Sequence, residues 1–206
     1  MHPRLTLALA VMEAIGILAY AISGFIEARA RRLDPIGTFL VAMATAFGGG
    51  TVRDILLEHR PFYWVQHEDY VIALFVVSFF APMLLKAASG LFSERVLLVA
   101  DAIGLGLFSV SGTSLALDAQ LPGFTAAMMG VTTGVFGGVI RDVLCNEVPL
   151  ILRDSRPYAT CAFAGCLLYV FLDHINFDNV YSVLIATMFI LIARLVTFKF
   201  DIRLPH

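Results

Sequence analysis

A glycine-rich motif that ends in an Arg-Asp pair lies inside an apolar segment of this chain, and it occurs twice. The first copy is Phe47-Gly48-Gly49-Gly50-Thr51-Val52-Arg53-Asp54, and Phe136-Gly137-Gly138-Val139-Ile140-Arg141-Asp142 follows at an offset of 88 positions. The same offset aligns further residues without a gap: Glu13 with Asp101, Gly16 with Gly104, Ser23-Gly24 with Ser111-Gly112, Thr45 with Thr133, Pro61 with Pro149 and Tyr70 with Tyr158. This ungapped register indicates an internal duplication.

The composition around these motifs is that of a membrane protein. Of 206 residues, 59% are hydrophobic and 15% are charged, whereas soluble domains carry about a quarter of charged residues. The formal net charge is −2, and the basic residues do not gather on one stripe. We therefore expect no nucleic-acid partner.

A spanning helix needs about 20 mainly apolar residues, and the apolar runs predict seven of them. They lie near 5–27, 36–57, 70–87, 96–117, 123–145, 157–175 and 178–198. The predicted fold is an all-α membrane protein with one transmembrane domain over 1–206. It comprises a first repeat at about 5–87, a second at about 93–175 and a seventh helix. Three helices per repeat would make the second repeat enter from the opposite face, which predicts an inverted repeat.

The start of the chain resembles a signal peptide, but Glu13 interrupts its apolar run and has a counterpart in Asp101. We therefore expect residues 13–24 to belong to the fold. Lys and Arg are concentrated in the loops of one face: Arg29, Arg31, Arg32, Lys86, Arg95, Arg153, Arg156, Lys199 and Arg203. The positive-inside rule makes that face cytoplasmic, so the N-terminus is predicted outside and the C-terminus inside a cell (inner) membrane. Anionic lipid headgroups are expected partners of these loops.

Acidic and basic side chains inside the predicted spans are the first candidates for function. Estimated from a rise of about 1.5 Å per residue, Glu13 and Arg53 fall in the outer half of the membrane, and Asp101 and Arg141 in the inner half. We predict an ion pair in each half, because an unpaired charge in hydrocarbon is costly. Asp54 and Asp142 lie nearer the helix ends, where they could serve only as tethers.

The glycines allow two interpretations. Small residues let helices approach closely, and Gly130-x-x-x-Gly134 fits that packing pattern. Consecutive glycines at 48–50 and 137–138 also lower the cost of leaving helical geometry, which favours paired helix breaks along a polar path. Hydroxyls near these breaks are candidates to line the path, although each could bond back to its own helix; they belong to Ser23, Thr45, Thr51, Ser111, Thr132 and Thr133.

Other chemistry has little support. Cys145, Cys161 and Cys166 lie in apolar segments and are expected to be small core residues. The five histidines form no H-x-x-x-H pair, so we expect no metal site and no cofactor. No Ser-His or H-E-x-x-H arrangement is visible, which argues against an enzyme.

The paired G-G-x-x-R-D motifs, in a chain of this length with a 3+3+1 helix plan, resemble those of the prokaryotic trimeric intracellular cation (TRIC) channels. That family has also been catalogued as putative glycine transporters. The resemblance covers nearly the whole chain. It implies a homotrimer in which each protomer has a pore for monovalent cations, chiefly potassium, formed by the first, second, fourth and fifth helices. It also implies that the pore is kinked at the glycine runs. We expect constrictions at Gly48 to Gly50 and at Gly137-Gly138, and we expect Arg53 and Arg141, held by their acidic partners, to shape the gate.

From the residues alone, two functions stay open. Glycine breaks, hydroxyls and buried acids are compatible with a channel for potassium or sodium. Inverted repeats with broken helices and arginines also suit a secondary transporter of glycine or other small amino acids, because a helix N-terminus and a guanidinium can hold a carboxylate. The resemblance favours the channel.

Overall fold

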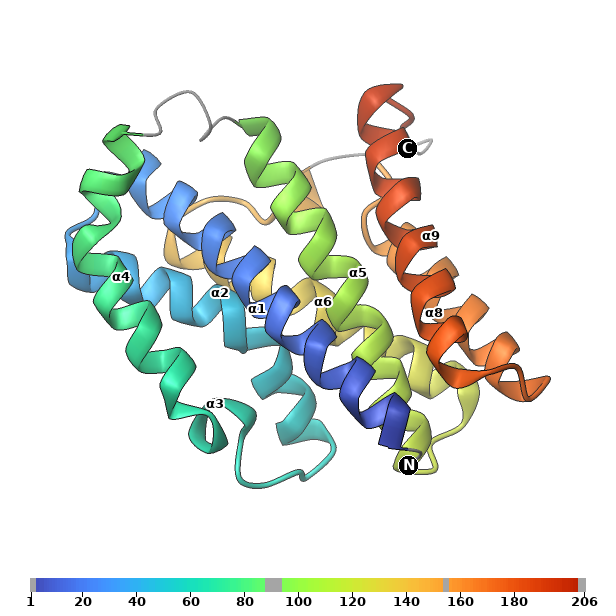
Figure 1. The fold of residues 1–206 in the computed structure, drawn as a ribbon. Helices are drawn as coiled ribbons and strands as arrows, with labels where there is room; N and C mark the ends of the chain where they lie inside the picture. The colour runs from blue at the N-terminus through green and yellow to red at the C-terminus, as the bar shows by residue number, and fades with distance from the viewer. Residues whose placement is uncertain (1–2, 88–93, 154–155, 204–206) are drawn as a thin grey trace.

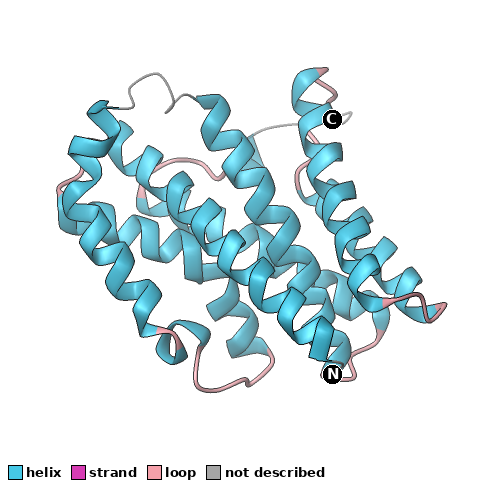
Figure 2. Ribbon diagram, in the orientation of Figure 1, coloured by secondary structure: helices cyan, strands magenta, loops and turns pink. Residues whose placement is uncertain are grey.

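The computed structural model describes residues 3–87, 94–153 and 156–203, and over these residues the regular structure is helical (Figure 2). In these ranges seven helices are long and two are single turns. Figure 1 shows how they are arranged. They are α1 (Pro3–Ala30), α2 (Pro35–Leu56), α3 (Tyr63–Gln66), α4 (Glu68–Ala87), α5 (Glu94–Asp118), α6 (Gly123–Leu144), α7 (Leu150–Arg153), α8 (Ala159–His174) and α9 (Asn179–Lys199).

Each predicted span corresponds to one long helix, with ends that differ by three residues or fewer. Among the described residues, five helices are long and apolar enough to cross a membrane, namely α1, α2, α5, α6 and α9. The apolar α8 has only 16 residues. The short helices α3 and α7 were not predicted, because a single turn leaves no periodic pattern in the sequence. The chain is thus a multi-pass membrane protein.

Four helices form the centre of the molecule. The most extensive contacts join α5 with α6, α1 with α5, α2 with α6, and α1 with α2. Figure 1 shows α1 and α5 side by side and antiparallel, with α4 at one side of this group and α8 and α9 at the other. In matching fashion, α4 packs on α2 while α8 packs on α6.

Helix ends recur at the 88-residue offset. Arg32 and Gln120 have positive φ angles of 54° and 62°, and so do Glu58 and Asn146, at 54° and 56°. Each closes a helix in the left-handed conformation that satisfies the last carbonyl groups. The predicted start of α2 is confirmed, since Asp34 caps it by accepting a hydrogen bond of 2.7 Å from the Gly37 amide, and Pro35 opens the helix.

The prediction that the glycine runs break their helices is wrong. Both α2 and α6 remain α-helical through Gly48–Gly50 and Gly137–Gly138, and no described glycine has a positive φ. Instead α2 changes direction along its length, so that its last turns leave the line of its first ones (Figure 1). Glycines lower the cost of such a bend without loss of the helical backbone hydrogen bonds.

Gly49 and Gly137 allow α2 and α6 to touch backbone to backbone. A Cβ atom on Gly49 would overlap the Thr133 carbonyl oxygen, and one on Gly137 would lie 2.5 Å from the Thr45 carbonyl oxygen. Thr45 and Thr133 are themselves 88 residues apart, so the two contacts match. The packing interpretation therefore applies to these two glycines, and equally to Gly130 and Gly134, whose Cβ atoms would overlap side chains of α5.

Gly50 provides a matched control for this close contact. We expect Gly49→Ala to lower the melting temperature of the detergent-solubilised protein, because overpacking a tight contact costs about 1–3 kcal/mol. Gly50→Ala should leave it unchanged or raise it, because a Cβ there would meet nothing nearer than Arg53 Nη2 at 3.8 Å and alanine favours a helix. Equal melting temperatures for the two variants would contradict a contact at Gly49.

Candidate functional site

The first of two ion clusters consists of Glu13 on α1 with Arg53 and Asp54 on α2. Arg53 Nη1 lies 2.9 Å from Glu13 Oε1, and Arg53 Nε lies 2.8 Å from Asp54 Oδ1. The Arg53 side chain is only 3% exposed. The predicted Glu13–Arg53 ion pair is thus confirmed, and it satisfies the rule that a buried charge is paired.

The second ion cluster consists of Asp101 on α5 with Arg141 and Asp142 on α6, and it has the same geometry. Arg141 Nη1 lies 3.0 Å from Asp101 Oδ1, and Arg141 Nε lies 2.9 Å from Asp142 Oδ1. Both Arg141 and Asp101 are 1% exposed. The predicted Asp101–Arg141 pair is confirmed as well, and it is buried more completely than the first because Glu13 is 11% exposed.

Each cluster receives a serine hydroxyl from the other half of the chain. Ser111 Oγ, on α5, lies 3.3 Å from Glu13 Oε1 and donates to it. Arg141 Nη1 donates to Ser23 Oγ, on α1. Since Ser23 and Ser111 are themselves an 88-residue pair, the two hydrogen bonds cross between the halves in opposite senses and join the halves at both clusters.

Asp54 and Asp142 do more than tether a helix end. Asp54 Oδ2 accepts a hydrogen bond from the Tyr63 amide at 3.4 Å, and Asp142 Oδ2 accepts one from the Leu150 amide at 2.9 Å. These amides belong to the single-turn helices α3 and α7. Each aspartate therefore links an arginine to the segment that follows its helix, and both aspartates are buried.

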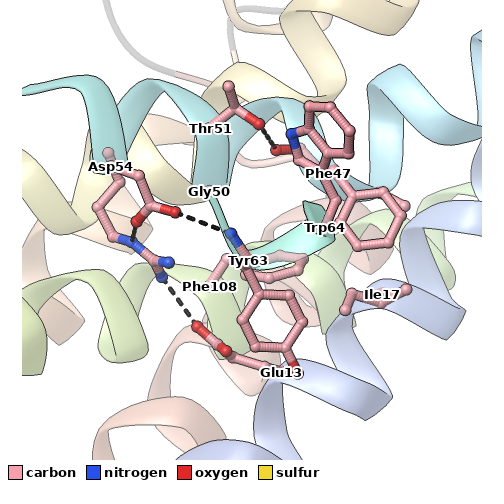
Figure 3. A pocket seen from close by; sticks show the side chains of 11 residues that line it. Glu13, Ile17, Phe47, Gly50, Thr51, Asp54, Tyr63, Trp64 and Phe108 are labelled. Carbon is pink, nitrogen blue, oxygen red and sulfur yellow. Dashed lines mark hydrogen bonds and ion pairs between the residues drawn. The ribbon is translucent and has the colours of Figure 1, made fainter. Parts of the chain in front are cut away.

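A small cavity of about 10 Å³, enough for about one water molecule, adjoins the first cluster. Figure 3 shows Glu13, Asp54, Tyr63, Trp64 and Phe108 around this space. Burial raises the pKa of Tyr63, which begins the single-turn helix α3 after the end of α2, so its hydroxyl stays protonated. A second cavity, too small to hold a water molecule, adjoins the second cluster, and its lining includes Gly138, Arg141, Asp142, Leu150 and Tyr158. Both arginines thus line a cavity, and only the cavity at the first cluster has room for a water molecule.

An aromatic pair lies at the contact between the halves. Tyr20 on α1 and Phe108 on α5, also 88 positions apart, have ring centroids 5.3 Å apart. The ring of Tyr20 lies against Gly104 and Gly137, where a Cβ would overlap it or lie 2.8 Å from it, and its hydroxyl donates to the Gly134 carbonyl. Phe108 also lines the first cavity. Tyr20, which is buried, thus holds α1 to α5 and α6.

Comparison with known proteins identifies the family. A family model described as "Glycine transporter" matches residues 10–86 and 98–174. The UPF0126 inner membrane protein YadS of Escherichia coli (strain K12) is 34% identical over 199 residues, covering 94% of this chain and 93% of that protein. YvgT of Bacillus subtilis (strain 168) is 31% identical over 199 residues, covering 95% of each.

Two solved structures are similar to this chain over nearly its whole length. The TRIC trimeric intracellular cation channel orthologue from Rhodobacter sphaeroides has a TM-score of 0.86 and 30% identity, covering 94% of this chain and 98% of that one. A structure of TRIC cation channels has a TM-score of 0.81 and 34% identity, covering 96% of each chain. The chain belongs to the TRIC family. Its solved relatives are membrane channels rather than enzymes.

In this TRIC-family chain the predicted hydroxyls divide into two kinds. The threonines bond back to their own helices: Thr45 to Val41 O at 2.6 Å, Thr51 to Phe47 O at 2.8 Å, Thr132 to Met128 O at 3.0 Å and Thr133 to Met129 O at 2.8 Å. Only the serines, Ser23 and Ser111, reach the ion clusters. The difference follows from position. Ser23 lies on α1 and Ser111 on α5, and each hydroxyl points toward an ion cluster.

Sequence reasoning missed Tyr20, Phe108 and Tyr63. The first two were detectable from the sequence. Tyr20 and Phe108 follow Gly16 and Gly104 by four residues, so the same 88-residue offset aligns the two aromatic side chains. Tyr63 gave no such signal, since its counterpart at the offset is Ile151. The three cysteines are buried and free, as predicted.

The two acids opposite the arginines differ in burial, which predicts unequal effects. Asp101→Asn should lower the free energy of unfolding by about 3–5 kcal/mol, the usual cost of breaking a buried ion pair. Glu13→Gln should cost less, because water reaches Glu13 and screens the change. Thermal unfolding of both variants in the same detergent tests this order. A larger loss for Glu13→Gln would show that burial does not govern these pairs.

Proposed function

We propose that this protein is a monovalent cation channel, with potassium as the chief permeant ion and one pore in each protomer. The pore is proposed to run through the centre formed by α1, α2, α5 and α6. The observation that carries this proposal is the charge of the two ion clusters. Each cluster pairs one arginine with two carboxylates, so its formal charge is −1. A path lined by net negative charge attracts cations and repels anions.

The described conformation suits a closed pore. The cavities at the two clusters are separate, and between the halves lie the Tyr20–Phe108 pair and the backbone contacts of Gly49 and Gly137. In the proposal, opening separates these contacts. Gly48, Gly49, Gly50, Gly137 and Gly138 let α2 and α6 bend as they move apart, while Arg53 and Arg141 shape the two ends of the path.

A carrier for glycine or other small amino acids is the second candidate, and the name of the family model supports it. Such a carrier needs a cationic group free to hold the substrate carboxylate. Here each arginine already faces two carboxylates of the chain. A substrate carboxylate would have to displace one of them, which makes the channel the better supported function.

The remaining features of the proposal follow from the chain as a whole. We infer that α1, α2 and α4 on one side and α5, α6 and α8 on the other are inverted repeats, and that α9 is the seventh crossing of a single domain. The matching contacts at the 88-residue offset support this. The N-terminus would lie outside and the C-terminus inside, with anionic lipids at the cytoplasmic loops. A homotrimer is proposed because the solved relatives include a trimeric channel.

Purified protein reconstituted in a planar bilayer tests the proposed function. Unitary currents carried by potassium are expected, with a reversal potential that follows the cation gradient. Saturable glycine uptake into vesicles without unitary currents would instead establish the carrier. Anion-selective currents would refute the role assigned to the charge of the clusters.

Arg53→Ala tests the role of the first cluster within the channel. It raises the formal negative charge of the cluster from −1 to −2 and leaves Glu13 and Asp54 without their cation. We expect an altered open probability or conductance, while Arg60→Ala, in a loop, should leave the currents unchanged. Normal currents from Arg53→Ala would reduce Arg53 to a tether between α1 and α2.

A further inference from the structure

Arg194, near the end of α9, is a buried cation with an unusual environment. Its side chain is only 5% exposed, and no carboxylate of the described residues forms an ion pair with it. Its Nη1 donates a hydrogen bond of 3.1 Å to the Pro157 carbonyl, its Nε has no hydrogen-bond partner, and its guanidinium carbon lies 4.5 Å from the centroid of the Tyr158 ring. A buried arginine is costly, so its contacts with 157–158 require an explanation.

Tyr158 connects Arg194 to the second ion cluster. It immediately precedes α8, is 5% exposed and lines the cavity of that cluster. A Cβ atom on Gly138 would lie 3.3 Å from Asp101 Oδ1 and 3.5 Å from the Tyr158 hydroxyl oxygen. The Tyr158 hydroxyl and the Asp101 carboxylate therefore both lie next to Gly138, while the Arg194 guanidinium lies over the face of the Tyr158 ring.

Within the described ranges, the first ion cluster has no arginine stacked on the tyrosine at the equivalent position. Tyr70, the residue 88 positions before Tyr158, is only partly buried, and its ring neighbours are Tyr63 and His67, with centroids 6.5 Å and 6.0 Å away. Figure 1 shows α9 on the opposite side of the molecule from α4, which carries Tyr70. The cavity at the first cluster has room for about one water molecule, whereas the cavity at the second cluster has none.

We propose that Arg194 is a positioning residue for the second ion cluster, and that it keeps that end of the path closed by holding Tyr158 over Asp101 and Arg141. In this proposal α9, which lies outside the two repeats, restrains the path at the second ion cluster but not at the first. The end of the path at the second cluster therefore controls opening. This proposal rests on the channel function proposed above. It assigns to α9 a regulatory role that the motifs of the repeats do not contain.

Single-channel recording tests the coupling between the two residues. Arg194→Met keeps the length and apolar stem of the side chain and removes the cation. We expect it to raise the ratio of open to closed time about tenfold, the size expected for loss of a desolvated cation–π contact. Unitary conductance should not change, because Arg194 does not line the path. Arg194→Lys, which retains the charge, should have a smaller effect.

Tyr158→Ala should reproduce the effect of Arg194→Met, and the double variant should show no further increase, because both changes remove one contact. Tyr70→Ala is the matched control at the first cluster and should leave gating unchanged. Additive effects of Arg194→Met and Tyr158→Ala, or an equal response to Tyr70→Ala, would overturn the proposal.

A labelling experiment separates this proposal from the proposed function, since it needs no ion current. Val139 and Thr51 line the two cavities at equivalent positions. Each is replaced by cysteine in a protein whose Cys145, Cys161 and Cys166 are alanine, and a charged thiol reagent is added. Arg194→Met should speed modification at position 139 severalfold and leave position 51 unchanged.

The outcomes divide clearly. Equal acceleration at positions 51 and 139 would mean general loosening of the fold and would overturn the role of Arg194, as would no acceleration at either position. If the unmodified protein carries no current but labelling at position 139 responds selectively, the channel function fails while the contact between Arg194 and Tyr158 stands. Gel filtration shows whether each variant retains the assembly state of the parent protein.

Discussion

The structure depends on burying two guanidinium groups between apolar helices. Each of Arg53 and Arg141 is nearly inaccessible to solvent, and each is bracketed by an acid from the preceding helix of its half and by the aspartate that follows it in sequence. Removing such a charge from water costs several kcal/mol, which only close partners offset. The contacts between α1 and α2 and between α5 and α6 are therefore constrained at these points.

This requirement explains why so much of the fold was predictable. A charge inside an apolar run demands a partner at similar depth, and the 88-residue register supplied Glu13 for Arg53 and Asp101 for Arg141. The spans followed from hydropathy, and the start of α2 followed from Asp34 and Pro35. Long-range pairing could thus be predicted without an alignment, because few charged residues lie deep in the spans and the alternatives were few.

The glycines show where such reasoning stops. A run of glycines lowers the cost both of a bend and of close packing, and the sequence does not say which one the surrounding structure exploits. The answer depends on what lies opposite. Gly49 faces the Thr133 carbonyl and Gly137 faces the Thr45 carbonyl, so these two glycines serve close packing. Gly50 instead faces Arg53, and Gly138 faces Asp101 of the second cluster. The threonine hydroxyls likewise donate to a backbone carbonyl of their own helix. This local hydrogen bond forms in preference to one with a polar group on another helix.

Departures from the repeat are as informative as the repeat itself. Tyr20 donates its hydroxyl hydrogen to the Gly134 carbonyl, whereas its counterpart Phe108 has no hydroxyl and can only pack. Phe136 stands where Gly48 would be expected, so α6 has one glycine fewer at its motif than α2. The first difference acts on the contact between the halves, where Gly48 also lies against Ile140, whereas Phe136 is exposed. Arg194 adds a further difference at the second cluster. The two ion clusters carry the same charges but are packed differently. The helices around them are therefore restrained to different degrees, because the packing around a cluster determines how readily its helices can move apart.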